Sequence, residues 1–105
     1  MSMCTVSETA MFQKWAAAVW SVAELDEFRV WIANNPLVGD VVQGSGGLRK
    51  VRWAASGRGK RGGARVIYFH VRHEQIWLLM VYTKAKFDNL PTGFLVQLRK
   101  EVQDD

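Results

Sequence analysis

Two long runs of β-branched and aromatic residues lie close together in the second half of the chain. They span Ala64 to Arg72 and Gln75 to Lys84, and a short charged turn separates them. Residues such as Val, Ile, Tyr, Phe and Trp favour strands, and a turn this short joins neighbouring strands in antiparallel order. We therefore expect a central β-hairpin, around which the rest of the fold must be arranged.

The segment before this hairpin is rich in glycine. Eight of the nine glycines lie between residues 39 and 63, and seven of them fall in clusters at 44–47 and 56–63, which indicates two loops. Between the clusters, the run from Leu48 to Ala54 alternates in the manner of a strand with one basic face. One side of this strand carries Arg49, Val51 and Trp53, and the other carries Lys50 and Arg52.

Two other segments have the spacing of amphipathic helices. Ser21 and Glu24 form a capping-box signature, which predicts a helix from Val22 that ends at Asn34-Asn35-Pro36. A second helix should follow Pro91, where apolar residues return at three- and four-residue steps. For the apolar stretch from Met11 to Trp20 we expect a short edge strand running into a helical turn.

The predicted elements run in the order strand, helix, three strands, helix. A chain of 105 residues is long enough for one hydrophobic core. We therefore expect a single domain over residues 1–105, with residues 1–10 loosely ordered. The predicted fold class is α+β: a small antiparallel sheet, mixed at its edge, of about four strands, with helices packed on one face.

The sequence also bears on the compartment. The longest apolar runs, such as Ile76 to Tyr82, are far shorter than the roughly 18 residues that span a bilayer. The first residues lack the charged and apolar regions of a secretory signal. One cysteine, Cys4, allows no internal disulfide, in agreement with a reducing compartment. We expect a cytoplasmic protein that has no contact with a membrane.

Positive charge is concentrated in one part of the chain. Between Val41 and His73 there are eight basic residues and no acidic one, although the whole chain carries only +4. A block this dense destabilises a compact fold by self-repulsion unless a polyanion or an acidic partner lies against it. A solvated basic face is the alternative. The absence of any acidic residue in the block favours a phosphate-bearing or acidic partner.

Three stretches of sequence carry a family resemblance. They are GSGGLRKVRW at 44–53, GRGKRGGARVIY at 57–68 and LLMVYTK at 78–84. They resemble the RelE/ParE toxin superfamily, and HigB-type toxins within it, over about residues 11–102. The resemblance implies a RelE-like (microbial RNase-like) fold. It also implies a messenger-RNA endonuclease that acts at the ribosome and is silenced by a tightly bound antitoxin.

The resemblance also implies site residues. Cleavage by attack of a ribose 2′-hydroxyl requires a proton acceptor, a donor to the leaving oxygen and cations for the charge on phosphorus. We assign stabilisation to Arg52 and Arg65, and proton transfer or further stabilisation to Lys50 and Lys84. The full catalytic set is Lys50, Arg52, Arg65, Lys84 and Tyr82; RNA or phosphate contacts are expected from Arg49, Arg58, Lys60, Arg61 and Trp53.

No cofactor is expected, and no metal, because the sequence has no His, Cys, Asp and Glu cluster with ligand spacing. His70 and His73 are given structural or surface roles. The expected partners are messenger RNA, the ribosome and a cognate antitoxin, HigA-like with a helix-turn-helix DNA-binding domain. Two alternatives stay open: a ParE-like protein that poisons DNA gyrase, and an RNA-binding module without catalysis.

Overall fold

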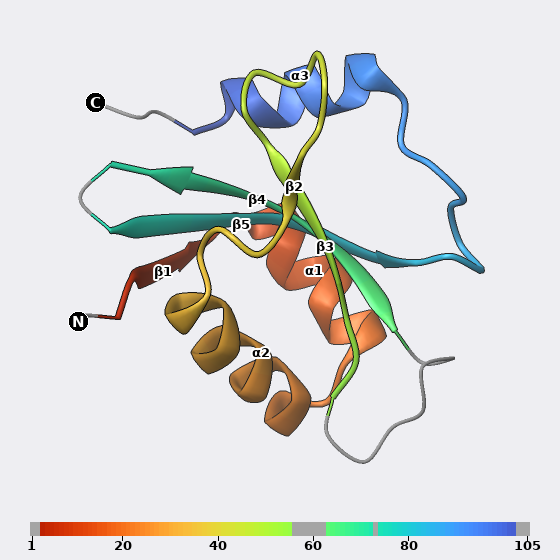
Figure 1. Cartoon of the computed structure of the whole chain (residues 1–105). Coiled ribbons are helices and arrows are strands. Elements are labelled where there is room, and N and C mark those ends of the chain that lie inside the picture. The colour runs from red at the N-terminus through yellow and green to blue at the C-terminus, as the bar shows by residue number, and fades with distance from the viewer. Residues whose placement is uncertain (1–2, 56–62, 73, 103–105) are drawn as a thin grey trace.

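The structure, a computed structural model, describes residues 3–55, 63–72 and 74–102. Its elements are β1 (Thr5–Glu8), α1 (Ala10–Val19), α2 (Val22–Asn34), β2 (Asp40–Val41), β3 (Arg49–Trp53), β4 (Ala64–Val71), β5 (Gln75–Thr83) and α3 (Thr92–Lys100). A twisted sheet crosses the middle of the molecule (Figure 1). The α+β class is as predicted. Across these described residues, no helix is long and apolar enough to cross a membrane.

The sheet has five strands in the order β1-β5-β4-β3-β2. The predicted hairpin is confirmed as β4 and β5, and β3 and β2 continue the antiparallel order. At the other edge, β1 pairs with β5 in parallel. The sheet is thus mixed at its edge, as expected, but has one strand more than expected. The short β2 was not predicted, and β1 lies in the region expected to be loosely ordered.

The stretch from Met11 to Trp20 is helical, so the predicted edge strand there was wrong. The strand comes earlier, at β1, and Thr9 then caps α1 by accepting a hydrogen bond from the backbone N–H of Phe12 (3.1 Å). The hydroxyl of Thr9 also donates to the carbonyl of Leu79 in β5 (3.3 Å). The start of α1 is therefore fixed directly to the central hairpin.

The second helix begins and ends where the sequence predicts. The Ser21 hydroxyl accepts from the N–H of Glu24 (3.1 Å), and the Glu24 carboxylate accepts from the N–H of Ser21 (2.9 Å). This reciprocal pair satisfies two N–H groups that a helix start otherwise leaves unpaired. The prediction of a capping box at this position is confirmed.

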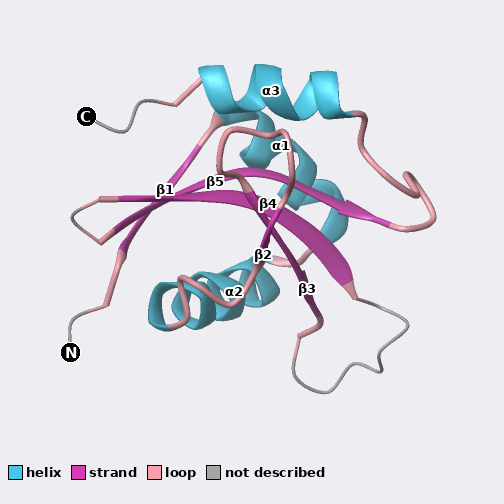
Figure 2. Cartoon of the chain, turned by 45° about the horizontal axis from the view of Figure 1, so that its top comes forward, coloured by secondary structure: helices cyan, strands magenta, loops and turns pink. Residues whose placement is uncertain are grey.

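Helices cover both faces of the sheet, whereas packing on one face was expected. Figure 2 shows α3 on one side of the sheet and α2 on the other. Each face has its own buried cluster. The cluster under α1 and α2 includes Phe12, Trp20, Phe28, Val66, Tyr68 and Leu78. The cluster under α3 includes Leu48, Ile67, Phe69, Leu79, Tyr82, Leu95 and Leu98.

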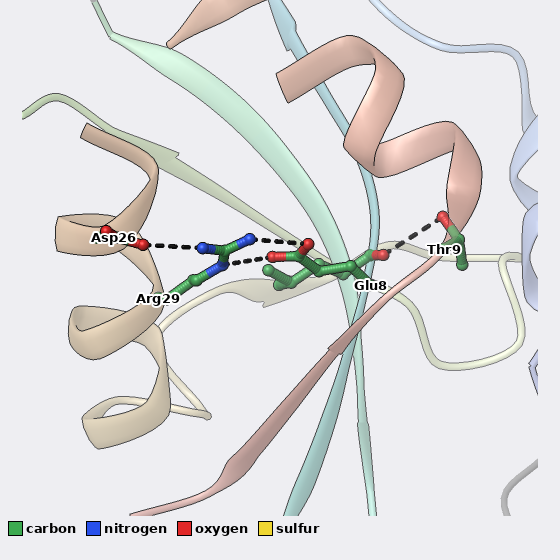
Figure 3. Close-up of polar contacts among 5 residues, drawn as sticks. Glu8, Thr9, Asp26 and Arg29 are labelled. Carbon is green, nitrogen blue, oxygen red and sulfur yellow. Dashed lines mark hydrogen bonds and ion pairs between the residues drawn. The ribbon is translucent and has the colours of Figure 1, made fainter. Parts of the chain in front are cut away.

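An ion pair joins α2 to the end of β1 (Figure 3). Arg29 of α2 donates from Nε and Nη2 to the two carboxylate oxygens of Glu8, at 2.6 and 3.0 Å. Its Nη1 donates to Asp26 on the same helix at 2.8 Å. The Glu8 side chain is only 9% exposed, so the two-point contact holds the edge strand against α2.

Candidate functional site

Arg52, Arg65 and Tyr82 form a row across three neighbouring strands. Arg52 of β3 is the register partner of Arg65 of β4, and Arg65 is the register partner of Tyr82 of β5. Paired residues of antiparallel strands project their side chains to the same face. Tyr82 belongs to the buried cluster under α3. The whole row therefore stands on the α3 face of the sheet.

Lys50 stands on the same face as this row. It lies two residues before Arg52 on β3, and side chains two apart in a strand share a face. Lys50 and Tyr82 border a common cavity of about 90 Å³. The other residues lining this cavity are Val42, Ile67, Asn89, Leu90 and Leu95. Four of the five predicted catalytic residues are thus brought to one face.

Lys84, the fifth, lies just beyond the sheet. The last register pair of the hairpin is Ala64 with Thr83, and Lys84 is an exposed residue of the turn that follows. Because β5 has ended, strand alternation no longer sets the direction of the Lys84 side chain. Lys84 therefore lies at the same end of β5 as Tyr82, but the strand geometry does not show whether its side chain shares the face of Arg52, Arg65 and Tyr82.

The Tyr82 phenol is buried beside a cation. Its residue is 1% exposed, and its hydroxyl has no hydrogen-bond partner among the described residues. Burial raises the pKa of Tyr82 above its ordinary value, while the positive charge of Arg65 acts to lower it. Since the net direction is upward, the hydroxyl keeps its proton near neutral pH. It is a hydrogen-bond donor without an acceptor.

Open space borders the row at both ends. A cavity of about 340 Å³ at the ends of β3 and β4 is lined by Arg52, Trp53, Ala54 and Gly63. On the other side, a cavity of about 260 Å³ lies between α1 and the end of β5. It is lined by Trp15, Ala18, Val19, Tyr82, Thr83 and Lys86. The row of Arg52, Arg65 and Tyr82 is therefore a strip of surface that lies between these two cavities.

Arg49 does not join this strip. It precedes Lys50 in β3, and adjacent strand residues point to opposite faces. Its Nη1 donates to the carbonyl of Gly39 at 2.7 Å. Gly39 sits tightly between β3 and Tyr68, whose hydroxyl accepts from the Gly39 N–H at 2.9 Å. Arg49 thus supports the segment that leads into β2.

Trp53 is also on the opposite face from Arg52. It is 8% exposed, and its ring packs against Trp20 at 5.4 Å, Phe28 at 5.2 Å and Trp31 at 6.3 Å between centroids. These contacts already occupy the ring within the aromatic cluster under α1 and α2. Trp53 therefore belongs to the hydrophobic core, and the expected contact of Trp53 with RNA stays a prediction.

Three of the expected phosphate contacts, Arg58, Lys60 and Arg61, lie outside the described residues, as does His73. His70 is half-buried on β4. Within residues 3–55, 63–72 and 74–102, no three His, Cys, Asp or Glu side chains gather in a way that could hold a metal ion. The candidate side chains that the structure brings to the α3 face are those of Lys50, Arg52, Arg65 and Tyr82.

Sequence reasoning missed Trp15, Lys86 and Asn89, which line the cavities beside Tyr82. Trp15 lies in the stretch predicted as a strand, so its distance from β5 could not be foreseen. Lys86 and Asn89 follow β5 in a segment that carried no pattern. The one feature of the sequence that could have indicated Lys86 and Asn89 was their closeness to Lys84.

No protein-family model matches the sequence. Among solved structures, the chain is similar to the Escherichia coli toxin RelE, in a structure of a double arginine-to-alanine mutant in the free state. The TM-score is 0.63 at 13% sequence identity, and the match covers 93% of this chain and 98% of that chain. This chain has a RelE-like fold. The RelE-like fold predicted from the sequence is confirmed, and the HigB-type branch stays a prediction.

Proposed function

We propose that the chain is the toxin of a type II toxin–antitoxin system, an endoribonuclease that cuts messenger RNA and so arrests translation. One observation carries the proposal: Lys50, Arg52, Arg65 and Tyr82 share one face of a RelE-like sheet. The similarity to a protein described as a toxin adds to it. The HigB-type resemblance in the sequence supports messenger RNA as the substrate.

The proposed reaction is an internal transfer at one phosphate. The 2′-oxygen of a ribose attacks the neighbouring phosphorus, a bond from phosphorus to O2′ forms, and the bond to O5′ breaks. The proton of the 2′-hydroxyl passes to a base, and O5′ receives a proton as it leaves. The products are a 2′,3′-cyclic phosphate and a 5′-hydroxyl, and no metal is required.

The two arginines stabilise the extra negative charge that develops on the phosphate oxygens. As cross-strand partners, Arg52 and Arg65 have Cβ atoms about 5 Å apart, so their guanidinium groups can reach one phosphate. Each guanidinium offers several N–H donors in a planar fork that fits phosphate oxygens. Hydrogen-bond donors that are already in position before the reaction stabilise the transition state more than donors that must first reorient.

Lys50 and Lys84 supply proton transfer or further stabilisation. Lys50 is the better placed, because it borders the same small cavity as Tyr82. The Tyr82 hydroxyl is buried in the free protein. Its proposed role is to donate a hydrogen bond to a phosphate or leaving oxygen once RNA binding has turned the side chain toward the substrate. In this scheme the row of Arg52, Arg65 and Tyr82 holds the scissile phosphate, and Lys50 acts from the adjacent position.

The natural substrate is messenger RNA on the ribosome. The cognate inhibitor is a HigA-like antitoxin with a helix-turn-helix DNA-binding domain, whose acidic or helical segments complement the positive face. The protein acts in the cytoplasm. Within the described residues, no carboxylate forms an ion pair with Lys50, Arg52 or Arg65. Their positive charge therefore suits both a polyanionic substrate and an acidic inhibitor.

The decisive test is to map messenger RNA ends after brief induction of the gene and, in parallel, with purified protein and intact ribosomes. We expect new 5′ ends within coding sequences for the parental protein and none for Arg65→Ala. DNA damage without RNA cleavage would favour the gyrase poison. Salt-sensitive RNA binding without cleavage would leave a binding module, and either result would overturn the proposal.

A further inference from the structure

The cavity between α1 and the end of β5 has the composition of a ring-binding pocket. Its volume is about 260 Å³, and its walls include a tryptophan, a tyrosine and small or apolar side chains of α1. Cavities of about 150 Å³ already accept benzene. Pockets for flat organic ligands are mostly apolar with a few polar groups that fix orientation. This cavity is large enough for a single nucleobase.

Trp15 offers its ring to this cavity. It is half-buried and packs against both hydrophobic clusters, and its ring lies 5.7 Å from that of Phe87 between centroids. The ammonium of Lys86 lies 6.0 Å from the Trp15 centroid, at the outer limit of a cation–π contact. Lys86 is exposed, so a ligand can displace its ammonium at little cost.

Tyr82 lies between this cavity and the two arginines of the row. It lines this cavity and is also the register partner of Arg65. Neighbouring strands lie about 4.8 Å apart, which places the cavity roughly one nucleotide from a phosphate held at Arg65.

We propose that the cavity bordered by Trp15, Tyr82 and Lys86 is a nucleobase subsite, which receives one base of the RNA strand whose phosphate lies on Arg52 and Arg65. The inference rests on the proposed function and names the part of the substrate held there. Single-stranded RNA is commonly bound through bases stacked on aromatic side chains. The displaced Lys86 ammonium then pairs with a phosphate of the same strand.

The test uses binding, so that it does not depend on cleavage. The four nucleoside 5′-monophosphates are titrated into the ¹⁵N-labelled protein, and the five tryptophan indole N–H signals are followed by NMR. We expect a saturable shift of the Trp15 signal that differs among the four bases, with Trp31 unmoved. Ribose 5-phosphate, which lacks a base, should leave Trp15 unmoved. An equal shift with ribose 5-phosphate would overturn the subsite.

A matched pair of variants guards against effects on folding. Ala18 lines the cavity, and Ala17 is an exposed neighbour on the same helix that does not. Ala18→Leu should fill the cavity and weaken mononucleotide binding at least tenfold, whereas Ala17→Leu should bind like the parental protein. Equal thermal unfolding of both variants excludes a folding defect. Unchanged binding by Ala18→Leu would overturn the proposal.

Cleavage then separates this inference from the proposed function. If the parental protein cuts RNA, Ala18→Leu should raise KM and relax the base preference around the cut, while kcat stays within a few-fold. If the parental protein cuts RNA and Ala18→Leu shows the same KM and base preference, the subsite is overturned but the proposed function is not. Absence of any parental cleavage would sink the proposed function, and the mononucleotide titration still decides whether a base binds beside Trp15.

Discussion

Arg52 and Arg65 face each other directly across β3 and β4, so two positive side chains stand side by side on one surface. Like charges in opposite positions of an antiparallel pair destabilise the sheet. No ion pair to a carboxylate relieves either arginine within the described part of the chain. A phosphate placed between them would turn this repulsion into attraction, which is the electrostatic basis of the proposed site.

The first prediction concerns stability. Replacing Arg65 by Gln keeps a polar, unbranched side chain but removes the charge that repels Arg52. We expect the free energy of unfolding to rise by about 0.2–1 kcal/mol at low salt, with a smaller gain at 1 M salt. Urea unfolding at both salt concentrations measures it. A variant less stable than the parent would show that Arg65 has an unrecognised stabilising partner.

The second prediction concerns activity. Arg52→Gln and Arg65→Gln should each lower the initial rate of RNA cleavage by about 100- to 1,000-fold, because each removes a fixed donor to the developing charge. Arg72→Gln is the control, since Arg72 belongs to the same basic block but lies in the turn at the far end of β4. Equal losses for all three variants would point to general attraction of RNA.

The third prediction uses the two buried tyrosines. The Tyr68 hydroxyl donates to the carbonyl of Pro36 at 2.8 Å and accepts from Gly39, whereas the Tyr82 hydroxyl has no partner in the described structure. Tyr68→Phe should therefore destabilise the protein by about 1–3 kcal/mol at pH 7. Tyr82→Phe should leave stability unchanged or slightly higher. Equilibrium unfolding of both variants checks the contrast.

The fourth prediction follows from the raised pKa of Tyr82. Burial makes the folded state hold the phenol proton to higher pH than the unfolded state, so stability is unaffected below about pH 10 and falls above it. Tyr82→Phe should make this alkaline decline shallower. Tyr68, whose pKa burial also raises, keeps part of the slope. Unfolding measured from pH 8 to 11 tests the difference, and identical slopes would contradict it.

The fifth prediction separates core from surface at Trp53. Trp53→Ala should cost about 3–5 kcal/mol of stability, because it empties the centre of an aromatic cluster. Trp53→Phe should keep much of the packing and bind RNA like the parental protein. A Trp53→Phe protein with parental thermal stability but weakened RNA binding would restore Trp53 to the RNA-contacting surface.

Local sequence signals predicted the elements that depend on local chemistry. Ser21 and Glu24 form the capping box that their spacing predicts, and α2 begins at Val22. The hairpin and the basic strand also match their patterns, because alternation already separates Val51 and Trp53 from Lys50 and Arg52. The common face of the catalytic candidates was predictable for the same reason.

Tertiary relationships were not predictable. The apolar stretch from Met11 to Trp20 has no clear period, and it is helical because Thr9 caps it and β5 offers a surface along which it packs. The placement of α3 on the second face depends on contacts such as that of the Arg99 guanidinium over the Phe69 ring at 4.0 Å. The cavity beside Trp15 exists only once α1 and β5 meet.

The parallel pairing of β1 with β5 has a consequence for biosynthesis. Thr5 pairs with Gln75, so β1 finds its neighbour only after the chain between them, which includes α1, α2, β2, β3 and β4, has been made. Such distant pairings slow folding because a long loop must close before they form. The nascent chain therefore holds β1 unpaired while these elements are synthesised, and the row of Arg52, Arg65 and Tyr82 is completed only when β5 follows them.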